Sequence, residues 1–185
     1  MQLRGVFSVL PTPFSEDGAV DVASLRRVVD LFLAAGVNGM TALGVTGEVA
    51  RLNESERELV LETVIAQASG RVPIIAGTSA DGLGTCIEHT QRAHAAGAAA
   101  VMVSPPRMAK LNSESVVAHY KTLASAVDIE IIVQDYPPIS GFTMEPPLLA
   151  RIAREVPRAR AISNWKTHRP RSRPFESSNK PRASK

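Results

Sequence analysis

The sequence predicts an α/β protein with parallel strands, and three observations support this prediction. Apolar runs alternate with segments of helical periodicity, and the runs begin about every 30 residues, the length of a βα repeat. Each run is nearly continuously apolar, as in parallel strands covered on both faces. Glycine and polar residues follow several runs directly. We therefore expect an incomplete (βα)₈ TIM barrel with about six βα units.

A doubly wound open sheet is the alternative architecture built from such repeats. Its dinucleotide-binding form carries G-x-G-x-x-G after the first strand, and this motif is absent after GVFSVL. Polar residues after several successive strands favour the barrel, because all strand ends of a barrel face one central site.

The predicted strands share an apolar composition and are bounded by Gly, Pro or polar residues. They are GVFSVL (5–10), NGMTAL (38–43), VPIIAG (72–77), AAAVMVS (98–104), IEIIVQ (129–134) and RARAI (158–162).

Capping signals place the helices between these strands. Asp21 can cap a helix over 22–35 that Gly36 ends, and Asn53 with Glu56 has the spacing of a capping box. In the helix after Asn53, the side chains expected to face inward are Leu59, Val60, Thr63 and Val64. Three further helices are predicted. The first opens with TSADGLG and ends in AHAAG, and the others lie over 113–126 and around 147–155.

The composition predicts a cytoplasmic globular protein. Hydrophobic residues make up 44% and charged residues 21%. The single cysteine, Cys86, excludes an internal disulfide and fits a reducing compartment. Every apolar run is shorter than the roughly 20 residues that span a membrane, so we expect no membrane association.

Charge divides the chain into two parts. Residues 163–185 contain seven basic side chains and one acidic side chain, whereas residues 1–162 have a net charge of −3. We therefore predict a partial barrel over 1–162 and a basic, disordered tail over 163–185. The acidic body argues against nucleic acid as a partner. A nucleic-acid-binding tail stays open as a weaker alternative, and it predicts salt-sensitive binding that deletion of 163–185 abolishes.

The loop GVTGE at 44–48 is the main candidate for ligand binding. Gly44 and Gly47 allow backbone N–H groups to turn toward an anion, and Thr46 adds a hydroxyl donor. A carboxylate could bind there. The alternative is an ordinary tight turn that places Glu48 near the next helix.

The histidines and the cysteine of the third predicted helix do not have the spacing of metal ligands. We interpret Cys86 as a core residue, and His89 and His94 as surface residues. No metal and no cofactor are predicted.

The chain resembles the dihydrodipicolinate synthase / N-acetylneuraminate lyase family over residues 3–162. The segments that carry the resemblance, in order, are GVFSVLPTPFSEDGAVD, ALGVTGE, RVPIIAGTSADG, AAGAAAVMVSPP and DYPPISG. The resemblance implies a TIM barrel, commonly homotetrameric, that binds pyruvate or another small 2-oxo acid as a Schiff base on a lysine. The substrate-binding positions that it implies are Gly44, Val45, Thr46, Gly47 and Gln134.

Several positions depart from the family pattern. Val45 replaces a hydroxyl residue of a proton relay, and Gln134 replaces the tyrosine that ends the fifth strand. Pro106 and Arg107 stand in a turn that is usually rich in tyrosine. Ile139 replaces the arginine that synthases use for their second substrate. These departures argue against a dihydrodipicolinate synthase in the strict sense.

The Gln134–Asp135 pair resembles the branch of the family that dehydrates 2-oxo-3-deoxy sugar acids. An amide cannot carry protons as a phenol does, but it can orient a substrate hydroxyl or a water molecule. Asp135 could act as a base, although we favour a role in capping its loop.

Ser163 is the departure with the largest consequence. The resemblance places the Schiff-base lysine directly after an isoleucine such as Ile162, and a serine hydroxyl cannot form an imine. We hypothesise a frameshift here. Loss of one A from the lysine codon of a family-like AIKQLEDPPTPFKT can give the I-S-N-W-K-T-H-R-P-R-S-R of residues 162–173.

The sequence therefore predicts a lyase lineage that acts on 2-oxo acids by aldol condensation, aldol cleavage or dehydration. This copy is expected to be inactive, with no intact catalytic residue. The alternative is a non-catalytic module that binds a 2-oxo acid.

Overall fold

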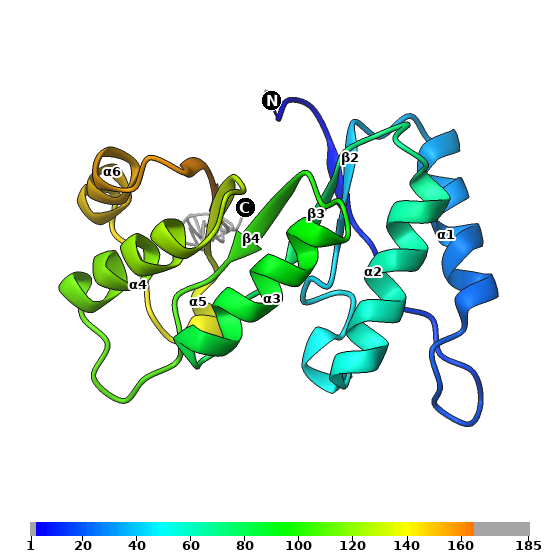
Figure 1. The fold of residues 1–185 in the computed structure, drawn as a ribbon, viewed down its shortest axis with the longest axis horizontal. Helices are drawn as coiled ribbons and strands as arrows, with labels where there is room; N and C mark the ends of the chain where they lie inside the picture. Colours follow the sequence, from blue (N-terminus) through cyan, green and yellow to red (C-terminus); the bar gives the residue numbers. More distant parts are fainter. Residues whose placement is uncertain (1–2, 165–185) are drawn as a thin grey trace, which may run out of the picture.

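The computed structural model describes residues 3–164, and these form one six-stranded parallel sheet with helices between the strands (Figure 1). The strands pair in chain order, each with the next, and all pairs are parallel. The strands are β1 (Phe7–Val9), β2 (Gly39–Ala42), β3 (Ile74–Gly77), β4 (Ala100–Val103), β5 (Ile131–Asp135) and β6 (Ala159–Asn164). This order without reversal is that of a barrel, because a doubly wound sheet changes direction at its switch point.

The helices occupy the predicted intervals. They are α1 (Val22–Ala34), α2 (Glu54–Ala68), α3 (Leu83–Ala95), α4 (Ser113–Ala126) and α6 (Pro146–Glu155), with a short 3₁₀ turn η1 (Val49–Arg51) and a one-turn helix α5 (Pro137–Ser140). Figure 1 shows α1 beside α2 at one end of the molecule and α4 beside α6 at the other. We did not predict η1 and α5, because each is a single turn inside a loop and has no hydrophobic period.

The predicted caps start the helices as expected. The Asp21 carboxylate accepts a hydrogen bond from Ser24 N at 2.9 Å. Asn53 and Glu56 form the reciprocal capping box. Gly36, with φ of 76°, follows the end of α1. These local bonds satisfy backbone donors that a helix end leaves open, so the local sequence specifies where these helices begin.

The two faces of the sheet bury different clusters of side chains. On the outer face, β strands and helices form one large core that includes Ile131 and Val133. On the inner face, four buried residues of three strands form a small cluster with Leu3, Phe7 and Ala161 packed against it. Those four residues are Ile75, Ala100, Met102 and Ile132. The alternation of neighbouring residues between faces is the period of a strand.

One packing prediction for α2 is wrong. Val60, Thr63 and Val64 are buried as expected, but the Leu59 side chain is 41% exposed. Leu59 lies about 100° around the helix from Val60, which takes it off the buried stripe. In the described part of the chain, no helix is long and apolar enough to cross a membrane.

Candidate functional site

The loop after β2 forms two backbone hydrogen bonds within itself and leaves two of its amides without an acceptor in the described part of the chain. Gly47 N donates to Gly44 O at 3.1 Å, and Glu48 N donates to Val45 O at 3.0 Å. The amides of Val45 and Thr46 have no acceptor among residues 3–164. Val45 and Thr46 are exposed, whereas Gly44 and Gly47 are buried. Two adjacent amides and one hydroxyl, all in exposed residues, could therefore donate to an anion.

Close backbone contacts hold this loop in place. The Thr12 hydroxyl donates to Gly47 O at 2.7 Å in a buried position. A Cβ on Gly77 would lie 2.0 Å from Leu43 O, and a Cβ on Gly44 would lie 2.8 Å from Val9 Cγ1. Leu43 itself adopts a φ of 57°. The loop therefore depends on two glycines that permit close approach and on a threonine that we did not predict.

Gln134 and Ser163 lie side by side on the inner face. They are register partners in β5 and β6, and Ser163 shares its face with Ala161 of the inner cluster. Gln134 is 8% exposed, and its Oε1 accepts a hydrogen bond from Ser104 Oγ at 2.7 Å. Ser104 in turn is 5% exposed and donates its backbone N–H to Ser79 Oγ at 2.9 Å. Sequence reasoning missed Ser104, whose partner lies 30 positions away.

Asp135 is used by its own loop. It is 3% exposed and accepts a hydrogen bond from Met144 N at 3.1 Å, just before α6 begins. This contact agrees with the loop-capping role that we favoured for Asp135 over a role as a base. It ties the long β5–α6 connection, which contains α5, back to the end of the strand.

The loops after β3 and β4 are also joined. Arg107 N donates to Asp81 Oδ1 at 3.0 Å, and Arg107 Nη2 lies 3.2 Å from Asp81 Oδ2. These bonds, from the Arg107 backbone first and then from its side chain, lower the pKa of Asp81 below its usual value. Arg107, at the position where the family resemblance predicted a tyrosine-rich turn, thus fixes loop geometry at the carboxyl edge of the sheet.

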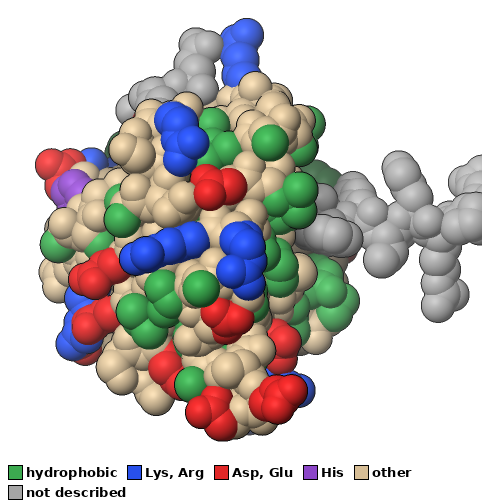
Figure 2. Space-filling model, turned by 90° about the vertical axis from the view of Figure 1, so that its right-hand side faces the viewer, with side chains coloured by type: hydrophobic (Ala, Val, Ile, Leu, Met, Phe, Trp, Pro, Cys, Tyr) green, Lys and Arg blue, Asp and Glu red, His purple; other side chains and the backbone are tan. Residues whose placement is uncertain are grey.

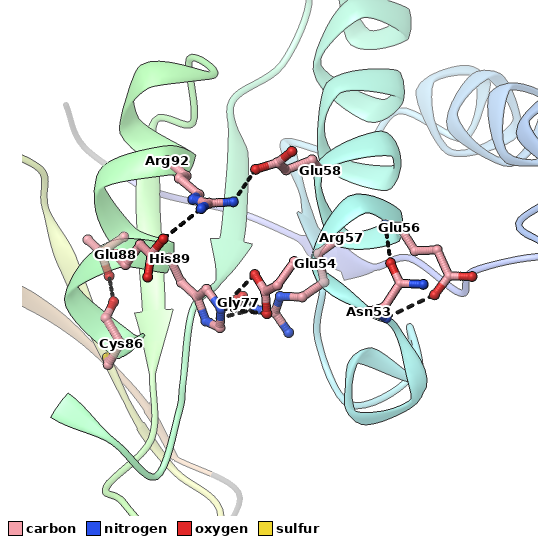
Figure 3. A network of polar contacts seen from close by, with 11 residues as sticks. Asn53, Glu54, Glu56, Arg57, Glu58, Gly77, Cys86, Glu88, His89 and Arg92 are labelled. Atoms are coloured by element: carbon pink, nitrogen blue, oxygen red, sulfur yellow. Dashed lines mark hydrogen bonds and ion pairs between the residues drawn. The ribbon is translucent and has the colours of Figure 1, made fainter. Parts of the chain in front are cut away.

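A cleft of about 340 Å³ lies between α2 and α3. It is lined by Glu54 and Arg57 of α2 and by His89 of α3, among others. Figure 3 shows these side chains pointing toward one another across the two helices. Arg57 Nη2 lies 3.4 Å from Gly77 O, so the cleft contacts the strand end that supports the site loop.

The polar network of this cleft determines which ring nitrogen of His89 carries the proton. Arg57 Nη2 lies 3.3 Å from His89 Nδ1, and His89 Nε2 lies 3.0 Å from the Glu54 carboxylate. Because a guanidinium only donates, Nδ1 accepts and Nε2 donates its proton to Glu54. Partial burial lowers the pKa of Arg57 from its usual value, and Glu54 offsets this in part. The predicted surface location of His89 is wrong: its side chain is 9% exposed.

The other reactive side chains are structural. Cys86 is fully buried, as predicted, and burial raises the pKa of its thiol to about 11. A thiol in that state is a poor nucleophile. Tyr120 is fully buried, and its hydroxyl donates to Val103 O at 2.8 Å. Burial raises the pKa of Tyr120 well above its usual value. His94 is exposed, as predicted.

Two further observations concern partners. Among residues 3–164, no group of three or more His, Cys, Asp or Glu side chains could hold a metal ion. On the face over α1 and α2, acidic and basic side chains are interspersed, with no block of one sign (Figure 2). Most of the predicted tail, residues 165–185, lies outside the described residues.

A parallel sheet whose strands pair in chain order, with glycine-rich and polar loops at the carboxyl ends of the strands, defines a protein of the (βα)₈ barrel class. Within this class, the chain belongs to the dihydrodipicolinate synthetase family, whose model matches residues 2–164. The predicted family and fold are confirmed.

Individual relatives agree with this assignment. The 4-hydroxy-tetrahydrodipicolinate synthase of Methylococcus capsulatus is 39% identical over 155 residues, which are 84% of this chain and 53% of the relative. A chloride-inhibited dihydrodipicolinate synthase from Acinetobacter baumannii, solved with pyruvate, is 33% identical with a TM-score of 0.85 and covers 88% of this chain and 56% of that one. The synthase of Thermotoga maritima gives a TM-score of 0.82 at 31% identity, over 86% of this chain and 54% of that one.

The chain spans about half the length of the curated relatives that it matches. The matched half contains the loop after β2 and the inner-face position in β6. The comparison therefore establishes the family of this chain and not the activity of the whole relatives.

Proposed function

We propose that this chain binds the carboxylate of a small 2-oxo acid, such as pyruvate, and does not form a Schiff base with it. The observation that carries the proposal is Ser163 on the inner face of β6, beside Gln134. The family resemblance expects a lysine at this position. Imine formation requires an amine that attacks the carbonyl carbon, and a hydroxyl cannot replace it.

The carboxylate is assigned to the loop after β2. The amides of Val45 and Thr46 and the Thr46 hydroxyl are its donors, while Gly44 and Gly47 permit the turn. Charge-assisted hydrogen bonds from such donors are stronger than bonds between neutral groups. The pyruvate complex of the Acinetobacter baumannii relative supports the class of ligand.

The barrel fold of the family supports a single ligand that contacts both regions. The strands β3 and β4 separate β2 from β5, which is about 14 Å along a flat sheet at the usual strand spacing. In a barrel, strands separated in this way face each other across the interior. A small acid could then contact the loop with its carboxylate and the Gln134–Ser163 pair with its 2-oxygen.

For the lineage, we propose the general reaction class of lyases that act on 2-oxo acids. A dehydratase-like role for Gln134 and Asp135 gains no support from the contact of Asp135 with Met144 N. The carboxamide of Gln134 stays the better candidate for contact with a substrate oxygen, because it faces the interior.

Two measurements test this proposal together. Purified chain incubated with pyruvate and sodium borohydride should show no added mass by mass spectrometry, whereas pyruvate alone should raise its thermal midpoint. Thr46→Val should reduce this stabilisation, and Thr122→Val, a matched change at an exposed position of α4, should not. A trapped adduct would overturn the absence of a Schiff base, and no stabilisation would overturn the binding site.

We further propose that Ser163 entered the chain by the single-base loss described above. The test is the coding DNA: its neighbouring reading frame should give family-like sequence from position 163 onward. Codons that give unrelated sequence in that frame would reject this origin.

A further inference from the structure

Three polar side chains lie on the inner face at the carboxyl ends of β4, β5 and β6. Their chemistry differs from that of a site that uses an amine. In place of a lysine and a phenol, the chain presents a carboxamide, Gln134, and two hydroxyls, Ser104 and Ser163. All three are neutral at every physiological pH. None of them can form an imine with a carbonyl carbon, so we expect hydrogen bonds to select the ligand.

The orientation of the carboxamide is determined by its neighbour. Ser104 Oγ donates to Gln134 Oε1 at 2.7 Å, and both side chains are buried. Ser104 is itself held through its backbone N–H by Ser79 Oγ at 2.9 Å. With Oε1 engaged on the β4 side, the Nε2 group of the same carboxamide carries the donors. The register partner on the other side of Gln134 is Ser163, which is half-buried.

The Nε2 donor of Gln134 beside the Ser163 hydroxyl can bind more than one kind of ligand oxygen. A ketone oxygen accepts from Nε2. A ligand hydroxyl can accept from Nε2 and at the same time donate to the Ser163 oxygen, because a serine hydroxyl both donates and accepts. An imine-forming lysine, in contrast, requires a carbonyl carbon and does not react with an alcohol.

From this arrangement we infer that the site recognises 2-hydroxy acids as well as 2-oxo acids, with Gln134 as the residue that reads the oxygen at carbon 2. The inference rests on the proposed carboxylate site at the loop after β2. Recognition of the carbon-2 oxygen, whether it is a carbonyl or a hydroxyl oxygen, then takes the place of the carbonyl-specific chemistry that the family resemblance implies. No covalent bond forms or breaks.

Calorimetric titration of the full chain with three acids of matched size tests the inference. The acids are pyruvate, L-lactate and propionate, which carry a carbonyl, a hydroxyl and no oxygen at carbon 2. Pyruvate and L-lactate should bind with dissociation constants within about threefold of each other, and propionate about tenfold more weakly, the value of one net hydrogen bond.

Two variants assign the effect to Gln134. Gln134→Ala should bind all three acids with nearly the propionate constant, because the carbon-2 contact is gone while the loop remains. Gln91→Ala is the matched control, a truncation of the same side chain at an exposed position of α3. It should preserve the difference between lactate and propionate. If Gln134→Ala does not fold, Ser163→Ala tests the same pair and should weaken L-lactate more than pyruvate.

The outcomes separate this inference from the proposed function. A preference for pyruvate over L-lactate of tenfold or more would overturn the inference, because it would require a carbonyl-specific contact. Equal binding of propionate and L-lactate would also overturn it, yet would leave the carboxylate site intact. Absence of binding by all three acids would overturn the carboxylate site itself, and the inference with it.

Discussion

The outer and inner faces of the sheet are built by different means. On the outer face, large side chains of strands and helices interlock, and Tyr120, Leu25 and Met40 are almost fully buried there. On the inner face, the buried apolar cluster has four residues, and the structure near the strand ends depends on backbone contacts and on hydrogen bonds such as Ser104 to Gln134. The comparison indicates that the outer face supplies most of the folding free energy, whereas the inner face carries the chemistry.

Two neighbouring isoleucines of β5 allow a direct test, and we expect the largest effect here. Ile131 belongs to the outer core and Ile132 to the inner cluster. Ile131→Ala should lower the free energy of unfolding by about 4 kcal/mol, and Ile132→Ala by about 2 kcal/mol, because a cavity in a small cluster collapses more easily. Urea unfolding measures both. Equal losses would show that the inner cluster is as well packed as the outer core.

A pair of glycines tests the inner face more closely. Gly77→Ala places a Cβ against the Leu43 carbonyl and should cost about 3 kcal/mol, because backbone must shift. Gly84→Ala in α3 meets nothing within 4 Å and should stabilise the chain by about 0.5–1 kcal/mol. The same urea unfolding experiment measures both. If Gly77→Ala were as stable as the parent chain, the loop after β2 would not depend on this close approach.

On both faces, the features that depend on neighbouring residues in the sequence were the predictable ones. α4 begins and ends at the predicted residues, because Asn112 caps it locally and accepts a hydrogen bond from Ser115 N. The glycine loop was predictable because its residues are contiguous. Thr12, Ser104 and the burial of His89 were not, because each depends on a partner at least 30 positions away. Sequence periodicity contains no information about such contacts.

His119 of α4 provides a pH-dependent test of the outer face. Burial lowers the pKa of His119 below its usual value, and Nε2 has no hydrogen-bond partner among residues 3–164. The pKa of an unfolded histidine is near 6.5. A pKa that differs between the folded and unfolded states changes the free energy of unfolding by at most about 1.4 kcal/mol per pH unit. The folded state takes up the proton less readily than the unfolded state does. The contribution of neutral His119 to stability is therefore complete above about pH 6.5 and declines as the pH falls.

We therefore expect the stability of the parent chain to fall between pH 7 and pH 5 more steeply than that of His119→Gln. His94→Gln, a change at an exposed histidine of α3, is the control and should follow the parent chain. Denaturant midpoints across this range measure the slopes. Identical slopes for the parent chain and His119→Gln would show that the buried imidazole accepts a proton without penalty.

The smallest expected effect lies at the start of α2, whose Arg57 contacts the carboxyl end of β3. Asn53→Ala removes the capping box and should cost about 1 kcal/mol, a typical value for the loss of an N-cap side chain. Asn112→Ala, which removes a single cap bond from α4, should cost no more than this.

The two variants should differ in ligand binding, because the first turn of α2 contains Glu54 and leads to Arg57, which contacts Gly77 O. A frayed turn loosens that contact, so Asn53→Ala should weaken pyruvate binding about twofold, whereas Asn112→Ala should leave it unchanged. Equal pyruvate affinity in both variants would mean that the α2–α3 network supports the fold without positioning the loop.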